Sequence, residues 1–214
     1  MSNGTFDFNE FIKESKDVLV NPKSYFSTMK TTGGIPEPLI KAVIYGAIAG
    51  IFSFLWSVLN IGAASSPMFG GAVGIMLFIW GIIGAVIGLF IGGVVVLILS
   101  AICKGSTDFE ANGRVVAASM VIMPINALLG FTAGLNSWLG MIISLCVSLY
   151  ALYILYHGLV ESLKAKPETA KIVMYVLAAL LVLFMLLGMS AKNKMNKYMD
   201  NDDVKEMLKD LENQ

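Results

Sequence analysis

Residues 72–103 read AVGIMLFIWGIIGAVIGLFIGGVVVLILSAIC, without one charged side chain. A single helix over this run would be about 48 Å long at 1.5 Å per residue, whereas the hydrocarbon of a bilayer is about 30 Å thick. No Pro, Asn, Asp or Lys interrupts it, and a tight turn at membrane depth would leave backbone groups unpaired. We therefore predict one long helix that must tilt, protrude or kink at a glycine.

The rest of the chain has the composition of a membrane protein. Of 214 residues, 57% are hydrophobic and 14% are charged, against about 25% charged in soluble domains. No Asp, Glu, Lys or Arg lies between Lys41 and Lys104 or between Arg114 and Glu161. We predict an all-α polytopic protein with a cytoplasmic tail (1–38), a transmembrane domain (39–190) and a charged C-terminal tail (191–214). Its five transmembrane helices are expected at about 39–60, 72–103, 115–134, 138–156 and 172–190.

Charge and residue types argue against nucleic-acid binding, a metal site and enzymatic chemistry. The formal net charge is zero, so no basic surface for nucleic acid is expected. The only histidine, His157, has no neighbouring ligands or nucleophile, and Cys103 and Cys146 stand apart in apolar sequence. We expect no catalytic residue, no metal and no cofactor.

Amphipathic helices are predicted near both ends of the chain, each as a surface that docks onto the protein itself, onto lipid or onto a partner. Near the N-terminus the apolar residues have nearly helical spacing, and Asn21 with Pro22 then opens a second short helix. In the C-terminal tail the spacing is i, i+3, i+4 and i+7. The candidate docking residues are Phe8, Phe11 and Ile12 in the first helix and Val204, Met207, Leu208 and Leu211 in the tail.

Small residues at intervals of four indicate close helix packing. One pair, Gly46 and Gly50, lies in the first predicted span, and a stripe of Gly84, Gly88 and Gly92 lies in the second. Packing inside the monomer is the favoured interpretation of the stripe, and formation of a homo-oligomer is the alternative.

The third predicted span contains a helix-breaking residue and a polar one. Pro124 removes a backbone donor and usually kinks a helix. Asn126, the most polar side chain placed deep in any span, needs a hydrogen-bond partner. We favour a structural bond from Asn126 to a freed carbonyl over contact with a ligand.

Lysine and arginine counts place the N-terminus in the cytoplasm but leave the number of spans open. Five spans put ten cationic residues inside and five, all in the C-terminal tail, outside. Six spans split the same charges equally well. The missing turn residues in 72–103 favour five.

The polar connection between the second and third spans reads GSTDFEANGRVVAASMVIMP and contains Gly105, Phe109, Arg114, Val115, Ser119 and Pro124. This pattern resembles the signature of the Yip-one domain family of Rab-interacting, multispanning membrane proteins. The upstream segment LVNPKSYF is similar to the family's opening. The resemblance implies five spans with a cytosolic N-terminus. It also implies, for eukaryotic relatives, binding of lipidated GTPases of the Rab class and vesicle traffic between endoplasmic reticulum and Golgi.

The short N-terminal tail is similar to compact prokaryotic members of that family. The resemblance implies the plasma (inner) membrane for a prokaryotic protein and the endoplasmic reticulum or Golgi for a eukaryotic one. The function predicted from these patterns is a membrane-embedded adaptor that organises proteins or lipids. The alternative is a small permease, channel or lipid-translocating protein, because a broken helix can line a solute path. Ion-coupled transport usually places Asp, Glu or His inside the membrane, and the predicted spans contain no such residue.

Overall fold

The structure, a computed structural model, describes residues 7–61 and 70–199, with side chains described for 7–61 and 74–188. All secondary structure in the described residues is helical. In order, the elements are α1 (Phe8–Val20), α2 (Pro22–Thr28), α3 (Pro36–Val58), α4 (Gly70–Ile102), α5 (Phe109–Ser119), α6 (Ile122–Leu129), α7 (Thr132–Leu135), α8 (Ser137–His157), the π-helical turn η2 (Gly158–Ser162) and α9 (Pro167–Met199).

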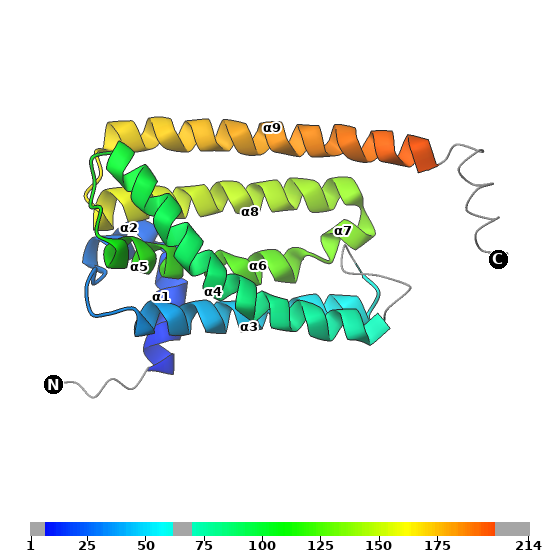
Figure 1. Cartoon of the computed structure of the whole chain (residues 1–214), viewed down its shortest axis with the longest axis horizontal. Helices are drawn as coiled ribbons and strands as arrows, with labels where there is room; N and C mark the ends of the chain where they lie inside the picture. Colours follow the sequence, from blue (N-terminus) through cyan, green and yellow to red (C-terminus); the bar gives the residue numbers. More distant parts are fainter. Residues whose placement is uncertain (1–6, 62–69, 200–214) are drawn as a thin grey trace.

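Five of the described segments are long and apolar enough to cross a membrane, which confirms the predicted all-α, five-span architecture. The chain is a multi-pass integral membrane protein. α4 is one continuous helix, as predicted, and runs obliquely across the more nearly parallel α3, α8 and α9 (Figure 1). The spans are Pro36–Val58, Gly74–Ile102, Phe109–Leu135, Ser137–Ser162 and Pro167–Gly188.

Glycines bring α3 and α4 into contact. A Cβ atom at Gly46 would lie 2.6 Å from the Ala85 Cβ, and one at Gly50 would lie 2.9 Å from the Phe78 carbonyl oxygen. The predicted stripe on α4 is only partly used for packing within the chain. Gly92 faces Val116 on α5, but a Cβ at Gly84 or Gly88 would meet no described atom within 4 Å. Close packing within the monomer is therefore wrong for Gly84 and Gly88.

The third span is divided into α5, α6 and α7, and its first break lies just before Pro124. Proline has no N–H with which to bond the Met120 carbonyl, and that carbonyl instead accepts from the Met123 N–H at 2.9 Å. The helix also begins at Phe109, earlier than the predicted residue 115, because the Asp108 side chain caps it by accepting from the Ala111 N–H at 2.8 Å.

The polar contacts of this span differ from those predicted. The Asn126 side chain is exposed and bonds to no described group, so the predicted bond to a freed carbonyl is wrong. The Met123 N–H already satisfies the carbonyl that Pro124 releases. At the second break, the Trp56 indole N–H on α3 donates to the Ala127 carbonyl at 2.9 Å.

The N-terminal helices lie across one end of the bundle (Figure 1), and the largest fully buried side chains are found there. Asp7 caps α1 and Asn21 caps α2, both through side-chain oxygens, as the sequence predicts for α2. Phe26 on α2, Val115 on α5 and Leu159 on η2 are almost fully buried together. The predicted amphipathic helix around Val204, Met207, Leu208 and Leu211 lies outside the described residues.

Candidate functional site: a charged cluster at the end of the bundle

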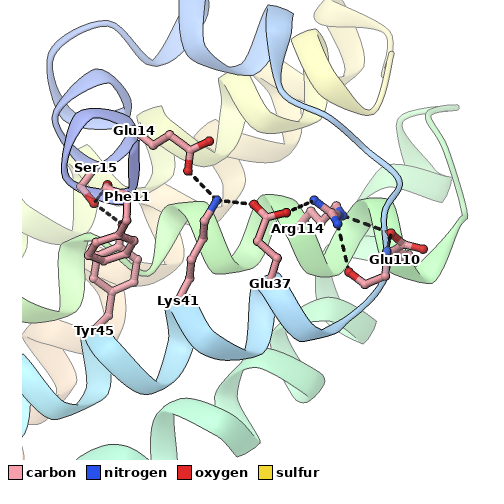
Figure 2. Close-up of polar contacts among 9 residues, drawn as sticks. Phe11, Glu14, Ser15, Glu37, Lys41, Tyr45, Glu110 and Arg114 are labelled. Atoms are coloured by element: carbon pink, nitrogen blue, oxygen red, sulfur yellow. Dashed lines mark hydrogen bonds and ion pairs between the residues drawn. The ribbon is translucent and has the colours of Figure 1, made fainter. Parts of the chain in front are cut away.

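Five charged side chains from three segments form one connected cluster (Figure 2). Lys41 Nζ on α3 lies 2.7 Å from Glu14 Oε2 on α1 and 2.8 Å from Glu37 Oε1. Glu37 Oε2 then accepts from Arg114 Nη1 at 2.9 Å, and Arg114 Nε donates to Glu110 Oε1 at 3.1 Å on α5. The ion pairs link α1 to α3 and α3 to α5.

Residue spacing within single helices accounts for two of these pairs. Glu37 and Lys41 are four residues apart on α3, and Glu110 and Arg114 are four residues apart on α5. Glu placed four residues before a cation is the favourable order on a helix. Tertiary packing then adds the bonds from Glu14 to Lys41 and from Arg114 to Glu37.

Arg114 also fixes the loop before α3. Its Nη2 donates to the Gly34 carbonyl at 3.0 Å, and the Gly34 N–H donates to Glu110 Oε1 at 2.6 Å. Gly33 has a φ of 132° and a Cβ there would lie 2.8 Å from Arg114 Nη2, so backbone conformation and space both require glycine.

Both cations are nearly buried, which makes their partners necessary. The side chains of Lys41 and Arg114 are 9% and 6% exposed, and an unpaired charge removed from water is strongly unfavourable. Three carboxylates surround two cations, so the cluster has a formal charge of −1. Such an arrangement holds three segments in fixed positions.

The same end of the bundle holds α1 through aromatic and hydroxyl contacts. The Phe11 ring lies 5.0 Å from the Tyr45 ring on α3, and the Ser15 and Tyr45 hydroxyl oxygens are 2.7 Å apart. The Tyr150 hydroxyl donates to the Leu19 carbonyl. Of the three predicted N-terminal docking residues, Phe11 therefore packs on its own chain. Phe8 and Ile12 are 58% and 51% exposed.

The polar connection that contains the family motif is bound to the loop before α9. The Ser106 N–H donates to the Leu163 carbonyl at 2.7 Å, and the Lys166 N–H donates to the Cys103 carbonyl at 2.8 Å. A Cβ at Gly105 would lie 2.5 Å from Ser100 Oγ and 2.9 Å from the Leu163 carbonyl oxygen. Glycine at position 105 lets these two loops approach.

The structure brings together only part of the predicted motif. Gly105, Phe109 and Arg114 lie at the α1 end, where the Phe109 ring is 3.2 Å from a Cβ built on Gly93. Ser119 donates to the Val115 carbonyl of its own helix at 2.8 Å. Pro124 and Asn126 lie in α6, beyond the first break of the span.

Sequence reasoning missed the acidic partners Glu14, Glu37 and Glu110. A signal was available, because Lys41 and Arg114 each stand at the start of a long uncharged stretch and each follows a glutamate by four positions. The link from Glu14 to Lys41 has no sequence signal, since 27 positions separate them.

Two pKa values near the cluster are shifted by burial. Burial raises the pKa of the Tyr25 phenol well above its usual range, and the nearby Glu14 carboxylate acts in the same direction. Burial also raises the pKa of the Cys103 thiol. Both groups are therefore held in their neutral forms.

A small, almost entirely apolar cavity adjoins the cluster. The cavity is lined by Ile35, Pro38, Leu89, Phe90, Phe109, Glu110 and Gly113.

Among the described residues there is no group of three or more His, Cys, Asp or Glu side chains arranged to hold a metal ion.

Comparison with known proteins gives one match. The family model described as the Yip1 domain matches residues 16–189. No curated protein and no solved structure matches the chain. The matched region includes Lys41, Glu37, Glu110 and Arg114, together with all five spans up to residue 188.

Proposed function

The chain belongs to the Yip1 domain family, and on that premise we propose that it is a membrane-embedded adaptor whose α1 end organises partner proteins or lipids in the cytoplasm. One observation carries the proposal. The buried cation Lys41 fastens α1 to the bundle, and the buried cation Arg114 fastens the Gly33–Gly34 loop. The charged side chains thus build a rigid face at one end of the molecule.

Charge distribution supports a cytoplasmic position for this face. Ten of the fifteen cationic residues lie at the α1 end, and eight of them are exposed there. Cytoplasmic ends of membrane proteins carry an excess of Lys and Arg. The exposed lysines are Lys13, Lys16, Lys23, Lys30, Lys104, Lys164, Lys166 and Lys171.

A photo-crosslinking amino acid placed in the full chain tests the adaptor function. We would place it at Lys23 on α2 or at Thr107 in the polar connection, both exposed at the α1 end, and at Ser137 at the opposite end as the matched control. We expect one protein to be captured in native membranes from both Lys23 and Thr107 and not from Ser137. A GTPase among the captured proteins would support, for this chain, the GTPase binding that the family resemblance implies.

Recovery of the chain alone from every position would argue against the adaptor. It would favour the second candidate, a path for a neutral solute or a lipid. The broken third span supports that candidate, because discontinuous helices often line such paths. Flux of uncharged solutes and of labelled lipids across liposomes that contain the purified chain would then decide between the two.

A further inference from the structure

The direction of α1 differs from that of the spans. Figure 1 shows α1 running across the end of α3 at a steep angle, with its N-terminal half extending past α3. Its contacts reach Lys41 and Tyr45, in the second and third turns of α3. Because α3 crosses the membrane, a helix that crosses its first turns lies along the membrane surface, level with the boundary between headgroups and acyl chains.

Two neighbouring faces of α1 are apolar, and only one of them is covered. Phe11 and Val18, seven positions apart, are 5% and 1% exposed and face the bundle. Phe8 and Ile12, four positions apart, share an adjacent face and are more than half exposed. Lipid is the occupant that fits this second face. Ile40, next to Lys41 in the part of α3 that α1 crosses, is likewise an exposed apolar side chain.

The size of this face also favours lipid over a protein. A stable protein interface buries about 800 Å² on each partner, and two side chains supply only a fraction of that area. A bilayer surrounds every span already, so Phe8 and Ile12 can enter it without assembling a separate interface.

Lysines flank the exposed apolar face on the side away from the bundle. Lys16 follows Ile12 by four positions, and Lys13 lies beyond it around the helix. Both are exposed and neither forms an ion pair with another described residue. Ammonium groups at this depth can reach lipid phosphates while their methylene chains cover apolar surface. The acidic Glu10 and Asp17 lie opposite Phe8 and Ile12, three and four positions from Lys13, whereas Lys16 has no acidic residue at either spacing.

We propose that α1 is an interfacial helix that inserts Phe8 and Ile12 into the bilayer beside α3 and holds the phosphate groups of anionic lipids with Lys13 and Lys16. The inference rests on the proposed function in one respect, that the α1 end is the working face of the adaptor. It assigns lipid, rather than a protein, to the outer side of α1, and leaves α2 and the loops for protein partners.

Spin labels on the full chain in liposomes measure the depth of α1. Cys146→Ala removes the exposed thiol, and the buried Cys103, whose pKa is raised, should stay unlabelled in that parent. We expect labels at Ile12→Cys and Phe8→Cys to collide more with dissolved oxygen than with a water-soluble nickel chelate. Glu10→Cys, exposed on the side of the helix opposite Ile12, is the matched control and should show the reverse. Equal nickel access at positions 8, 10 and 12 would overturn the insertion.

The role of the lysines is tested in the same labelled protein. Adding phosphatidylglycerol to phosphatidylcholine vesicles should deepen the label at position 12, and the pair Lys13→Gln and Lys16→Gln should abolish the change. The same depth in both lipid mixtures would overturn the phosphate contacts.

These outcomes are distinguishable from failure of the adaptor function. Deep labels without any crosslinked protein would preserve the lipid contact and argue against the adaptor. A protein captured in native membranes through crosslinkers at Phe8 and Ile12 would overturn the lipid assignment and leave the adaptor intact.

Discussion

Arg114 shows how one side chain can connect several segments. Its guanidinium donates to Glu37, to Glu110 and to the Gly34 carbonyl, three acceptors from different directions. A lysine ammonium is a compact charge and does not reproduce this planar fork. The arrangement therefore depends on the shape of the cation as well as on its charge.

Replacing Arg114 by Ala should lower the free energy of unfolding by roughly 2–4 kcal/mol, because three acceptors each lose a charged donor and the Gly34 carbonyl loses its bond to the bundle. Arg114→Lys should recover only part of that loss. Denaturation of the detergent-solubilised chain, followed by tryptophan fluorescence, measures both. The control is Lys166→Ala, which removes an exposed lysine. An Arg114→Lys variant as stable as the parent would contradict the fork geometry.

Gly105→Ala should destabilise the chain by about 1–3 kcal/mol, because its Cβ would press on the Ser100 hydroxyl and on the fixed Leu163 carbonyl. Gly113→Ala is the matched control in the same motif. A Cβ at Gly113 meets no described atom within 4 Å, and alanine has the higher helix propensity. Thermal unfolding of the two variants in one detergent makes the comparison, and equal melting temperatures would show that the loop at Gly105 can move aside.

At the scale of elements, glycine spacing identifies helices that can approach closely but does not say which face does so. Gly46 and Gly50 on α3 meet α4 as the spacing suggests, with Gly81 as a partner on α4 that the pattern did not select. Gly84 and Gly88 face no described neighbour. The i, i+4 pattern is the same in both cases. Only the packing of the helices decides whether that glycine face meets a neighbouring helix.

Gly46→Ala should cost roughly 1–3 kcal/mol, since its Cβ would lie 2.7 Å from the Gly81 carbonyl oxygen. Gly84→Ala should leave the stability of the monomer unchanged or raise it by up to about 1 kcal/mol. Unfolding in detergent, with the oligomeric state followed by light scattering, separates the two effects. Loss of an oligomer in Gly84→Ala would instead support the alternative that this stripe joins copies of the chain.

At the scale of the whole molecule, tight packing and cationic residues are concentrated at the same end. The largest fully buried side chains, Phe26, Ile154, Leu159 and Leu163, lie near the junction of α2, α8 and η2. Along α8 and α9 few residues of the spans are buried within the chain. One end is thus tightly packed, and the long helices extend from it (Figure 1).

The charge asymmetry predicts the orientation. With Cys146→Ala as the parent, Thr107→Cys should resist a membrane-impermeant thiol reagent added to intact cells and react after permeabilisation, because positive ends stay in the cytoplasm. Ser137→Cys, at the opposite end of the bundle, should react in intact cells. Labelling of Thr107→Cys from outside would reverse the assignment and place the charged cluster on the external side.

The sequence by itself determined the class of protein, favoured five spans over six and identified the helix cap at Asn21, because these depend on local properties. Uninterrupted apolar length selects a spanning helix, and Asn21 before Pro22 selects a helix start. The i, i+4 glutamates before Lys41 and Arg114 were also readable, although their joining into one cluster was not.

Only the tertiary structure decided what each face of a helix meets. Glu14 lies 27 positions from Lys41, and Tyr150 lies 131 positions from its acceptor, Leu19. No sequence period encodes such distances. The same reason explains why Asn126 has no described partner and why Gly84 packs against no described neighbour. A local pattern shows that a residue is polar or small, but not which neighbour its side of the helix faces. Contact between distant segments depends on how the helices pack, which is a property of the whole chain.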